Sequence, residues 1–337
     1  MDVLVCGAQA PFTRGGAEMA QENIVTALRE AGHRAELVRV PVAWEKGRIF
    51  DSATAWRSIP LDADLVIATN FPSYFARHDN KVVWLFHQHR AAYDALGAAW
   101  SDLGEDDTSL ETQRLLAEWD CRALGEARMI FTLSEVVVNR LARYNGLDSR
   151  TLYHPPPLAD RLRVGEYGDY LFCPSRLEQN KRPSRVVAAL PGSGDLRAVL
   201  AGTGSLKDSL LRQAADAGVA DRVELAGFVS DDDLIDLFAN CLAVVYAPHE
   251  EDYGYVTLQA FLAGRPVITT DDSGGVLEWV RDGENGFVTD GSDQALQEAT
   301  ARLHEDRELA RRMGQEGRRL VESLSWSSVV ETLTRGY

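Results

Sequence analysis

The chain has 337 residues, of which 45% are hydrophobic and 26% are charged, and its formal net charge is −16. This composition is typical of a globular protein long enough for two domains. The acidic balance excludes the basic surface that nucleic-acid binding requires. It also disfavours firm binding to an anionic membrane, while leaving peripheral association open. No run approaches the ~18 apolar residues of a membrane-spanning helix.

Four widely spaced cysteines form no CxxC pair. Cys6, Cys173 and Cys241 lie in apolar, strand-like runs, which predicts reduced thiols in the core. Reduced thiols fit a cytoplasmic location, which we therefore expect. The histidines and cysteines lack zinc-like spacing, so we expect no structural metal.

Strands and helices alternate along the first half of the chain. An apolar run at 3–8 predicts the first strand, and the helix expected over 17–31 ends at Gly32, the usual C-terminal glycine. An acidic helical segment is expected over 101–124, and a further helix over 136–144. The other predicted strands of this half are 35–40, 64–69, 81–87, 128–134 and 150–154.

The alternation breaks at three prolines, 155–157, which predict a stiff connector. It then resumes with strands predicted at 170–175, 196–202, 222–228, 241–248, 265–271 and 286–290. Such alternation is typical of parallel sheets covered by helices. We therefore predict two doubly wound α/β domains, 1–155 and 158–321, followed by an amphipathic C-terminal segment. In such sheets ligands bind at the carboxyl ends of the strands.

The stretch 247–268 is the most informative part of the sequence. It opens with two carboxylates, Glu250 and Glu251, turns at 252–254 and continues as a short helix. The first turn of a helix offers unpaired N–H groups and a partial positive charge, while a carboxylate can hold hydroxyl groups. These features together predict a site for a sugar joined to a phosphate.

Two basic residues, Arg176 and Lys181, directly follow the predicted strand 170–175. An arginine supplies a planar fork and a lysine a point charge, which together suit a diphosphate. The structural alternative is a solvated basic loop before a helix, and the acidic stretch downstream disfavours that alternative.

The stretch 247–268 resembles the signature of glycosyltransferase family 4, which has two glutamates separated by seven residues and then a G-x-P-V-I strand. Here Glu251 stands at the first glutamate, Gln259 replaces the second, and the strand motif follows as Gly264, Pro266, Val267 and Ile268. The resemblance covers nearly the whole chain and is most specific over 170–287.

The resemblance implies a GT-B fold, in which two Rossmann-like domains face a cleft. The acceptor-side domain would be 1–155 and the donor-binding domain 158–321, with the terminal helix 322–337 packing back on the first domain. The implied activity is retaining transfer of a sugar from a nucleotide-sugar donor to a hydroxyl acceptor (a hexosyltransferase of class EC 2.4). Neither a cofactor nor a metal would be needed.

For individual residues, the resemblance implies that Arg176 and Lys181 stabilise the leaving diphosphate and that Glu251 holds sugar hydroxyls. His87, at the end of the strand 81–87, would contact the donor sugar, with His89 as the competing candidate. The catalytic residues predicted are therefore Glu251, Arg176, Lys181 and His87.

Paired glycines before the first helix permit close approach of a ligand to the backbone, although a plain turn explains them nearly as well. They are not part of the dinucleotide motif G-x-G-x-x-G, which is absent. The resemblance extends donor binding to two further loops and to the helix after Glu251. The donor-binding residues predicted are Gly15, Gly16, Gly202, Gly204, Phe228, Val229, Tyr253, Gly254, Tyr255, Val256 and Gln259.

Glutamine at position 259 keeps one carbonyl acceptor but lacks the negative charge of glutamate. A charged hydrogen bond contributes about 1.5–3 kcal/mol, against about 1 kcal/mol for a neutral one. We therefore expect Gln259 to weaken donor binding without abolishing the reaction.

Three consecutive carboxylates, 231–233, could suggest a metal-binding DxD motif. They stand at the start of a predicted helix, where they would cap it and favour its dipole. We prefer this structural interpretation, and no metal ligands are predicted.

Two alternatives to the transferase stay open at this point. One is a catalytically weak or inactive GT-B protein that only binds a nucleotide sugar, and the other is a GT-B epimerase or phosphorylase. The sequence does not decide the donor nucleotide or sugar, the acceptor, the linkage or the oligomeric state.

Overall fold

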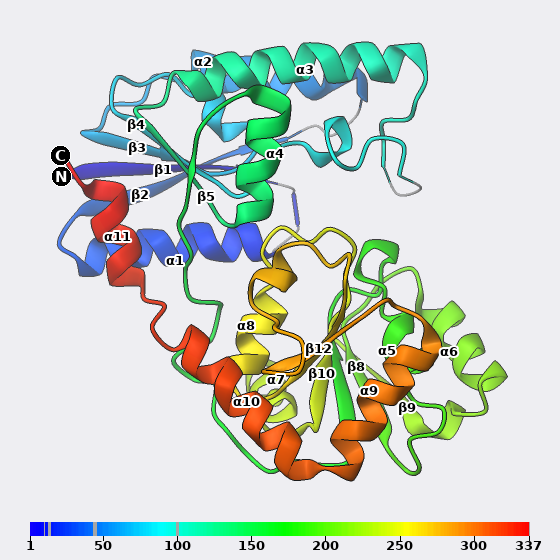
Figure 1. The fold of residues 1–337 in the computed structure, drawn as a ribbon. Coiled ribbons are helices and arrows are strands. Elements are labelled where there is room, and N and C mark those ends of the chain that lie inside the picture. The colour runs from blue at the N-terminus through cyan, green and yellow to red at the C-terminus, as the bar shows by residue number, and fades with distance from the viewer. Residues whose placement is uncertain (10, 13–14, 43–45, 99–100, 337) are drawn as a thin grey trace. The chain divides into compact units, whose positions relative to one another are not determined.

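A computed structural model describes residues 1–9, 11–12, 15–42, 46–98 and 101–336. The chain forms two compact units, drawn in Figure 1. Unit 1 comprises Met1–His154 and Leu324–Tyr337, and unit 2 comprises Pro155–Ser323. The division falls directly before the three prolines that were predicted to form the connector.

Unit 1 contains a six-stranded sheet in the order β2-β1-β3-β4-β5-β6, in which every neighbouring pair is parallel. Its strands are β1 (Asp2–Gln9), β2 (Arg34–Pro41), β3 (Leu65–Ala68), β4 (Lys81–Leu85), β5 (Met129–Thr132) and β6 (Arg150–Thr151). Its α-helices are α1 (Gly16–Glu30), α2 (Ile49–Ser58), α3 (Asp107–Gly125), α4 (Glu135–Asn145) and α11 (Trp326–Thr334). Its 3₁₀ helices are η1 (Lys46–Arg48), η2 (Ser73–Phe75) and η3 (Arg90–Ala92).

The central strands β3 and β4 are buried along their whole length because helices cover both faces of the sheet. The C-terminal helix α11 belongs to unit 1 and packs against α1. The ring of Trp326, its first residue, lies 6.1 Å from the ring of Trp84 in β4 and 5.1 Å from that of His154. Aromatic packing thus holds the end of the chain on the first sheet.

Unit 2 contains a second six-stranded parallel sheet, in the order β12-β11-β10-β7-β8-β9. Its strands are β7 (Tyr170–Pro174), β8 (Arg197–Ala201), β9 (Val223–Gly227), β10 (Ala243–Val245), β11 (Val267–Thr270) and β12 (Gly286–Thr289). Its α-helices are α5 (Ser184–Ala188), α6 (Lys207–Asp216), α7 (Asp231–Asn240), α8 (Tyr255–Leu262), α9 (Asp293–Glu305) and α10 (Arg307–Val321). Its 3₁₀ helices are η4 (Gln179–Lys181), η5 (Ala220–Arg222) and η6 (Gly275–Glu278).

Helix α10 packs closely on α8 because two of its glycines face that helix. A Cβ atom at Gly317 would lie 2.3 Å from the ring of Phe261, and one at Gly314 would lie 1.9 Å from the carbonyl oxygen of Gly264. This close packing fixes the position of α8, whose first turn is part of the predicted donor site.

The prediction of two doubly wound α/β domains is confirmed, since each unit has a parallel sheet with helices on both faces. Two local expectations were wrong. The helix expected from residue 101 begins at Asp107, because the carboxylate of Asp106 accepts the N–H of Ser109 at 3.1 Å and caps the helix there. Helix α7 is capped by the Ser230 hydroxyl rather than by the carboxylates 231–233, which form its first turn.

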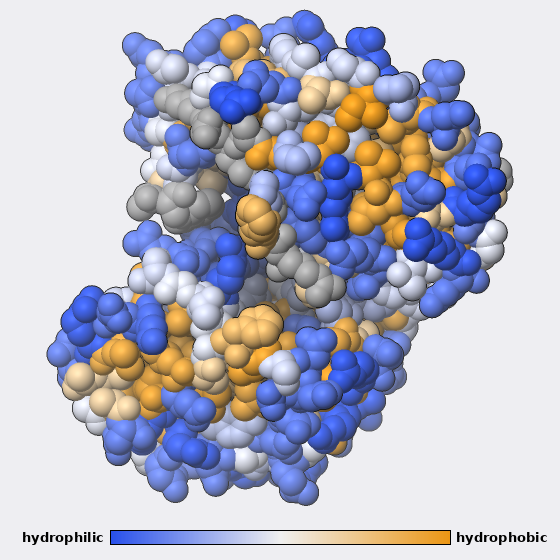
Figure 2. All heavy atoms as spheres, turned by 180° about the vertical axis from the view of Figure 1, so that it is seen from behind, coloured by the Kyte–Doolittle hydropathy of each residue, from blue (hydrophilic) through white to orange (hydrophobic). Residues whose placement is uncertain are grey.

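In the described part of the chain, no helix is both long enough and apolar enough to cross a membrane. Hydrophilic residues make up most of the surface on the side that Figure 2 shows, with separate hydrophobic areas between them.

Candidate functional site

Three loops of unit 2 meet at the carboxyl edge of its sheet. They follow β7, β10 and β11, which are adjacent in the sheet order. Parallel strands end at the same edge, so residues 175–182, 246–254 and 271–275 lie side by side there. This is the edge at which doubly wound sheets bind their ligands.

Lys181 and Glu251 lie together, as the predicted site requires. The ammonium group of Lys181 forms an ion pair with the Glu251 carboxylate, and both side chains are mostly buried. The hydroxyl of Tyr246 donates to the same carboxylate oxygen at 3.0 Å. Burial, followed by the charge of Glu251, raises the pKa of Tyr246 well above its ordinary value, so this tyrosine stays a hydrogen-bond donor.

Arg176 is exposed, and its side chain has no hydrogen bond or ion pair with any other described residue. It lies close enough to Tyr246 for its charge to oppose the rise of that residue's pKa. An unpaired guanidinium group beside an ion-paired lysine leaves five N–H donors available to an anion.

A third cation, Arg182, was missed by the sequence analysis. Its guanidinium group forms a two-point ion pair with Asp272, at 2.7 and 2.6 Å. These hydrogen bonds hold the pKa of Asp272 well below its ordinary range. The two residues are 90 positions apart, so the only sequence signal was that Arg182 extends the basic run after β7.

Glycines hold the loop of Glu251 against the next loop. A Cβ atom at Gly274 would lie 2.6 Å from the carbonyl oxygen of Glu251, and one at Gly275 would lie 2.5 Å from that of Asp252. Gly254, the N-cap of α8, has φ of 79°, a conformation that favours glycine. Tyr253 is buried behind this turn.

The first turn of α8 begins with Tyr255 and Val256, both half-exposed. They lie at the carboxyl edge, and their role in binding an anionic group stays a prediction.

The loop after β8 is joined to the loop that carries Arg176. A Cβ atom at Gly202 would lie 2.1 Å from the carbonyl oxygen of Ser175, and one at Gly204 would lie 2.4 Å from that of Leu177. The carboxylate of Glu178 accepts the N–H and the hydroxyl of Ser205, at 3.0 and 2.7 Å. These hydrogen bonds lower the pKa of Glu178, so it stays ionised.

After β9, Phe228 projects into solvent with 89% of its surface exposed, while Val229 is half-buried. An aromatic side chain exposed to this extent at a strand end offers a flat face on which a base could stack.

Gln259 makes a contact that its sequence position did not reveal. Its side-chain amide donates to the carbonyl oxygen of Pro157, at 3.1 Å, and only 8% of the residue is exposed. A glutamate could not make this contact, because an ionised carboxylate only accepts hydrogen bonds. Gln259 therefore ties α8 to the proline connector.

The remaining predicted residues belong to unit 1 and follow strands of its sheet. Gly15 is the N-cap of α1 and donates its N–H to the Glu18 carboxylate at 2.9 Å, and Gly16 begins the helix. Positions 10, 13 and 14 of the same loop lie outside the described residues.

His87 follows β4 and is half-buried, with Nδ1 3.0 Å from the carbonyl oxygen of Gln88. His89 is 8% exposed, and its Nε2 lies 3.6 Å from Asp102. His87 is therefore the more accessible of the two candidates, and its role stays a prediction.

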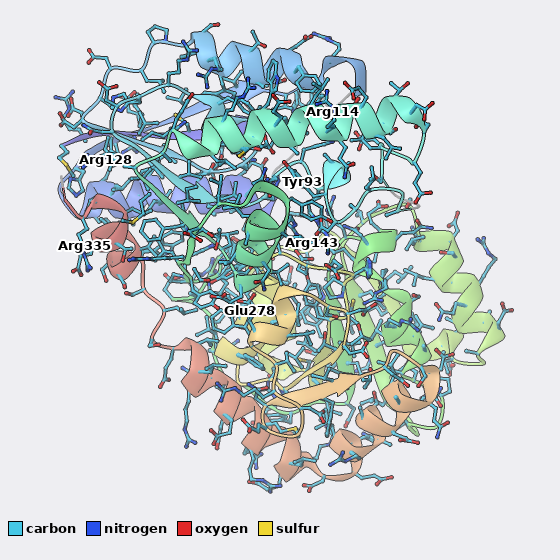
Figure 3. The ribbon with its side chains drawn as sticks, turned by 45° about the horizontal axis from the view of Figure 1, so that its top comes forward. Tyr93, Arg114, Arg128, Arg143, Glu278 and Arg335 are labelled. Carbon is cyan, nitrogen blue, oxygen red and sulfur yellow. The ribbon has the colours of Figure 1, made fainter. Side chains whose placement is uncertain are left out.

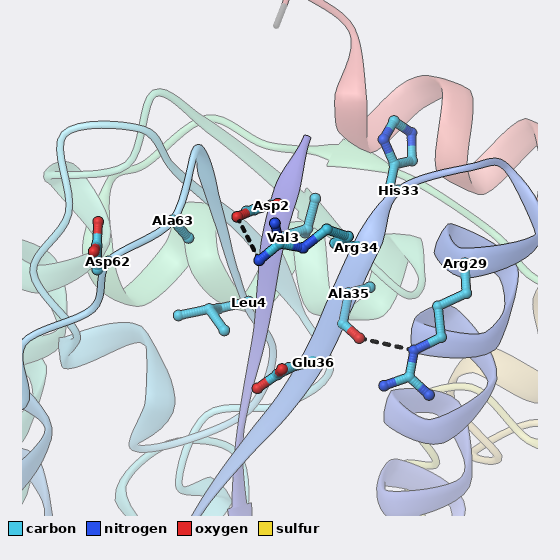
Figure 4. A pocket seen from close by; sticks show the side chains of 10 residues that line it. All are labelled: Asp2, Val3, Leu4, Arg29, His33, Arg34, Ala35, Glu36, Asp62 and Ala63. Atoms are coloured by element: carbon cyan, nitrogen blue, oxygen red, sulfur yellow. Dashed lines mark hydrogen bonds and ion pairs between the residues drawn. The ribbon is translucent and has the colours of Figure 1, made fainter.

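A cavity of about 440 Å³ in unit 1 lies away from these residues, at the amino ends of β1 and β2 (Figure 4). It is lined by both carboxylates and basic groups; Arg34 in it pairs with Asp2 at 3.1 Å. Within the described residues, no three His, Cys, Asp or Glu side chains are grouped as a metal site.

A known protein family matches the part of the chain that contains the loops of unit 2. Residues 160–320 match the family model of glycosyl transferases group 1. The chain is similar over its whole length to the crystal structure of Anabaena Alr3699/HepE in complex with UDP and glucose, with a TM-score of 0.73, 18% identity and coverage of 99% and 98% of the two chains. The structure of WaaG, a glycosyltransferase involved in lipopolysaccharide biosynthesis, gives a TM-score of 0.71, with 20% identity and coverage of 99% and 100%. The fold is GT-B.

Among curated proteins, the chain is 36% identical over 186 residues to the GDP-mannose-dependent alpha-(1-6)-phosphatidylinositol monomannoside mannosyltransferase of Mycobacterium tuberculosis, covering 50% of this chain and 48% of that protein. It is 28% identical over 260 residues to the D-inositol 3-phosphate glycosyltransferase of Nocardia farcinica, covering 66% and 57%. The chain thus matches about half the length of such relatives. Both of these relatives are named as glycosyltransferases or mannosyltransferases.

Proposed function

We propose that the chain is a retaining glycosyltransferase of family 4 that transfers a sugar from a nucleotide-sugar donor to a hydroxyl acceptor without a bound metal. The observation that carries the proposal is the grouping of the Lys181–Glu251 ion pair with Arg176, which is exposed and unpaired among the described residues. This grouping lies at the strand ends of the segment that matches the family model.

The proposed chemistry follows from where charge develops. Negative charge builds on the diphosphate as the bond to the anomeric carbon breaks, and Arg176, Lys181 and the first turn of α8 are the donors available to it. Preorganised donors of this kind are usually the largest catalytic contribution, and removing one lowers the rate by about 10²–10³. Glu251 would hold the sugar hydroxyls. The acceptor would attack from the face that the diphosphate leaves, and its hydroxyl proton would pass to the departing diphosphate.

The known donors of similar proteins narrow the choice of donor nucleotide. One relative is described as GDP-mannose-dependent, and solved structures of similar fold contain UDP or UDP-glucose. We propose a UDP- or GDP-sugar as the donor. The acceptor stays undefined, since the relatives act on different molecules.

Thermal unfolding with UDP-, GDP- and dTDP-sugars, with Mg²⁺ or EDTA, tests the donor class. A donor at 100 times its dissociation constant stabilises the folded state by about 2.7 kcal/mol. For a protein of this size we expect a rise in Tm of roughly 5 °C with one nucleotide class. Arg176→Ala should abolish the rise, while Arg212→Ala, which removes an exposed arginine of α6, should keep it.

A rise that disappears in EDTA would contradict the metal-independent mechanism. No rise with any nucleotide would contradict donor binding itself. Once an acceptor is found, the anomeric configuration of the product, measured by NMR, decides between retention and inversion.

A further inference from the structure

The side chain of Arg182 joins three loops at the carboxyl edge of the second sheet. Besides Asp272, its guanidinium group donates to the carbonyl oxygens of Ala247 and Pro248, both at 2.7 Å, and to the Thr270 hydroxyl at 2.8 Å. These partners lie on the loop after β10, at the end of β11 and on the loop after β11, whereas Arg182 lies on the loop after β7. Its own backbone is in the left-handed region, with φ of 46°. A non-glycine residue is rarely held there unless its surroundings fix it.

The loop that Arg182 holds is the one that carries Glu251. Further along this loop, the N–H of Glu250 donates to the carbonyl oxygen of Asp272 at 3.0 Å, and that of Glu251 donates to Ser273 at 3.3 Å. Glu250 is also in the left-handed region, with φ of 51°. The loop is therefore strained, and it is held from both sides by the loops after β7 and β11.

Most of the Arg182 guanidinium group is already engaged by the protein, and its side chain is only 19% exposed. Each of its three guanidinium nitrogens already donates to an oxygen of the protein. Arg176, in contrast, is exposed and unpaired among the described residues. The basic residues after β7 therefore differ in function: Arg176 can bind an anion, whereas Arg182 holds loops together.

Resting on the proposed transferase function, we propose that Arg182 is a positioning residue. By bonding Asp272 and the carbonyl oxygens of Ala247 and Pro248, it fixes the loop that places the Glu251 carboxylate against Lys181. It acts on the reaction through Glu251 and touches neither donor nor acceptor.

The test compares turnover with nucleotide affinity in matched variants. In Arg182→Ala we expect kcat to fall about 100-fold, since a reacting group displaced by about 1 Å can lose that much. The affinity for UDP or GDP should not fall, because Arg176 and Lys181 are still present and Lys181 is released from Glu251. Arg182→Lys should recover part of kcat, since it restores a single cationic donor.

The control is Arg222→Ala. Arg222 also donates to backbone carbonyl oxygens of unit 2, those of Gly194 and Leu196 at 2.6 and 3.2 Å, but it lies before β9, away from the carboxyl edge. Its loss should lower stability while leaving kcat within about twofold of the wild type. A role of Arg182 in stability alone would make the two variants behave alike.

A second measurement does not depend on activity. Hydrogen exchange of the Glu250 and Glu251 amides should become at least about tenfold faster in Arg182→Ala and stay unchanged in Arg222→Ala. If Arg182→Ala does not fold, Arg182→Lys and Asp272→Asn provide the same comparison.

Unchanged kcat, or unchanged exchange of these amides, would overturn the proposal. A loss of UDP or GDP affinity as large as that in Arg176→Ala would overturn it too, because it would show direct contact with the donor. Wild-type protein that neither binds nor turns over any nucleotide sugar would refute the proposed function, and hydrogen exchange alone would then decide whether Arg182 fixes the loop.

Discussion

At the scale of single residues, Lys181 and Glu251 form an ion pair with each other, although both are predicted to bind the nucleotide-sugar donor. The side chains are 16% and 20% exposed, so solvent screens the pair only partly. A diphosphate that approaches Lys181 competes with the Glu251 carboxylate and is also repelled by it. The same carboxylate that would hold the sugar therefore weakens binding of the nucleotide alone.

Glu251→Gln should consequently bind the free nucleoside diphosphate more tightly while it turns over less donor. Charged hydrogen bonds contribute about 1.5–3 kcal/mol, so we expect an affinity gain of about tenfold and a loss of kcat of about 100-fold. Isothermal titration with UDP and GDP measures the first, and initial rates measure the second.

The matched control for this prediction is Glu224→Gln, which removes an exposed carboxylate of β9 and changes the net charge equally. An equal gain in both variants would mean that net charge, rather than release of Lys181, sets the affinity. Weaker nucleotide binding in Glu251→Gln would refute the competition directly.

At the scale of elements, the start of α8 depends on one glycine. The φ of 79° at Gly254 turns the chain from the Glu251 loop into the helix. A Cβ atom there would also lie 2.9 Å from Cγ2 of Val276. The direction of the first N–H groups of α8 is thus set jointly by the turn and by its packing against η6.

Gly254→Ala should destabilise unit 2 by about 2–5 kcal/mol, since left-handed strain of about 1–2 kcal/mol adds to overpacking of about 1–3 kcal/mol. Gly283→Ala is the control, because Gly283 has φ of 75° but no heavy atom near the added Cβ. It should cost only about 1–2 kcal/mol. Urea unfolding measures both, and equal losses would show that Val276 moves aside freely.

The elements were more predictable than the contacts between them. Alternating apolar runs and glycines were enough to predict two doubly wound domains. Because parallel strands end at the same edge of a sheet, Arg176, Lys181 and Glu251 could also be expected to lie together. The start of α3 was misplaced because a capping carboxylate, Asp106, overrides the helical pattern before it.

The Arg182–Asp272 pair could not have been predicted, because nothing local relates two residues separated by 90 positions. The same holds for the amide of Gln259, whose sequence position suggests a donor ligand but whose contact is with the connector. The direction of a side chain at a strand end depends on which loops lie beside it. The hydrophobic periodicity of the sequence predicts helices and strands, but it does not predict which loops become neighbours.

At the scale of the whole molecule, the chain carries a net charge of −16 but buries charged groups in unit 1. Lys81 is fully buried and donates to the carbonyl oxygens of Tyr74, Ala76 and Ala123 at 2.8–3.0 Å. Burial lowers its pKa to about 8. Asp120 of α3 is also buried, and burial raises its pKa to about 6 although the Tyr93 hydroxyl donates to it at 2.6 Å.

These two shifts make the stability of unit 1 depend on pH. An acid with a raised pKa keeps its proton in the folded state when the unfolded chain has lost it, so the folded state loses stability as pH rises from about 4 to 6. For Lys81 the folded state gives up its proton first, so stability recovers as pH rises above about 8. Between these two pH ranges, Asp120 and Lys81 are both charged in the folded state, and the desolvation of both charges lowers its stability.

Asp120→Asn isolates the first shift. The asparagine oxygen can still accept from Tyr93, which Figure 3 labels, and the amide carries no charge. Relative to the wild type, this variant should gain about 3 kcal/mol of unfolding free energy between pH 4 and 6.5, and no more above that. Other groups around this carboxyl are Tyr74, Gln88 and His89, so His89 has to be followed by NMR over the same range.

Glu111→Gln, on the exposed face of the same helix, is the control of opposite sign, because Arg114 lowers the pKa of Glu111. Removing that carboxylate should lower stability above the titration range of glutamate, and salt should screen the effect. A difference between Asp120→Asn and the wild type that does not change with pH would show that Asp120 keeps one protonation state throughout.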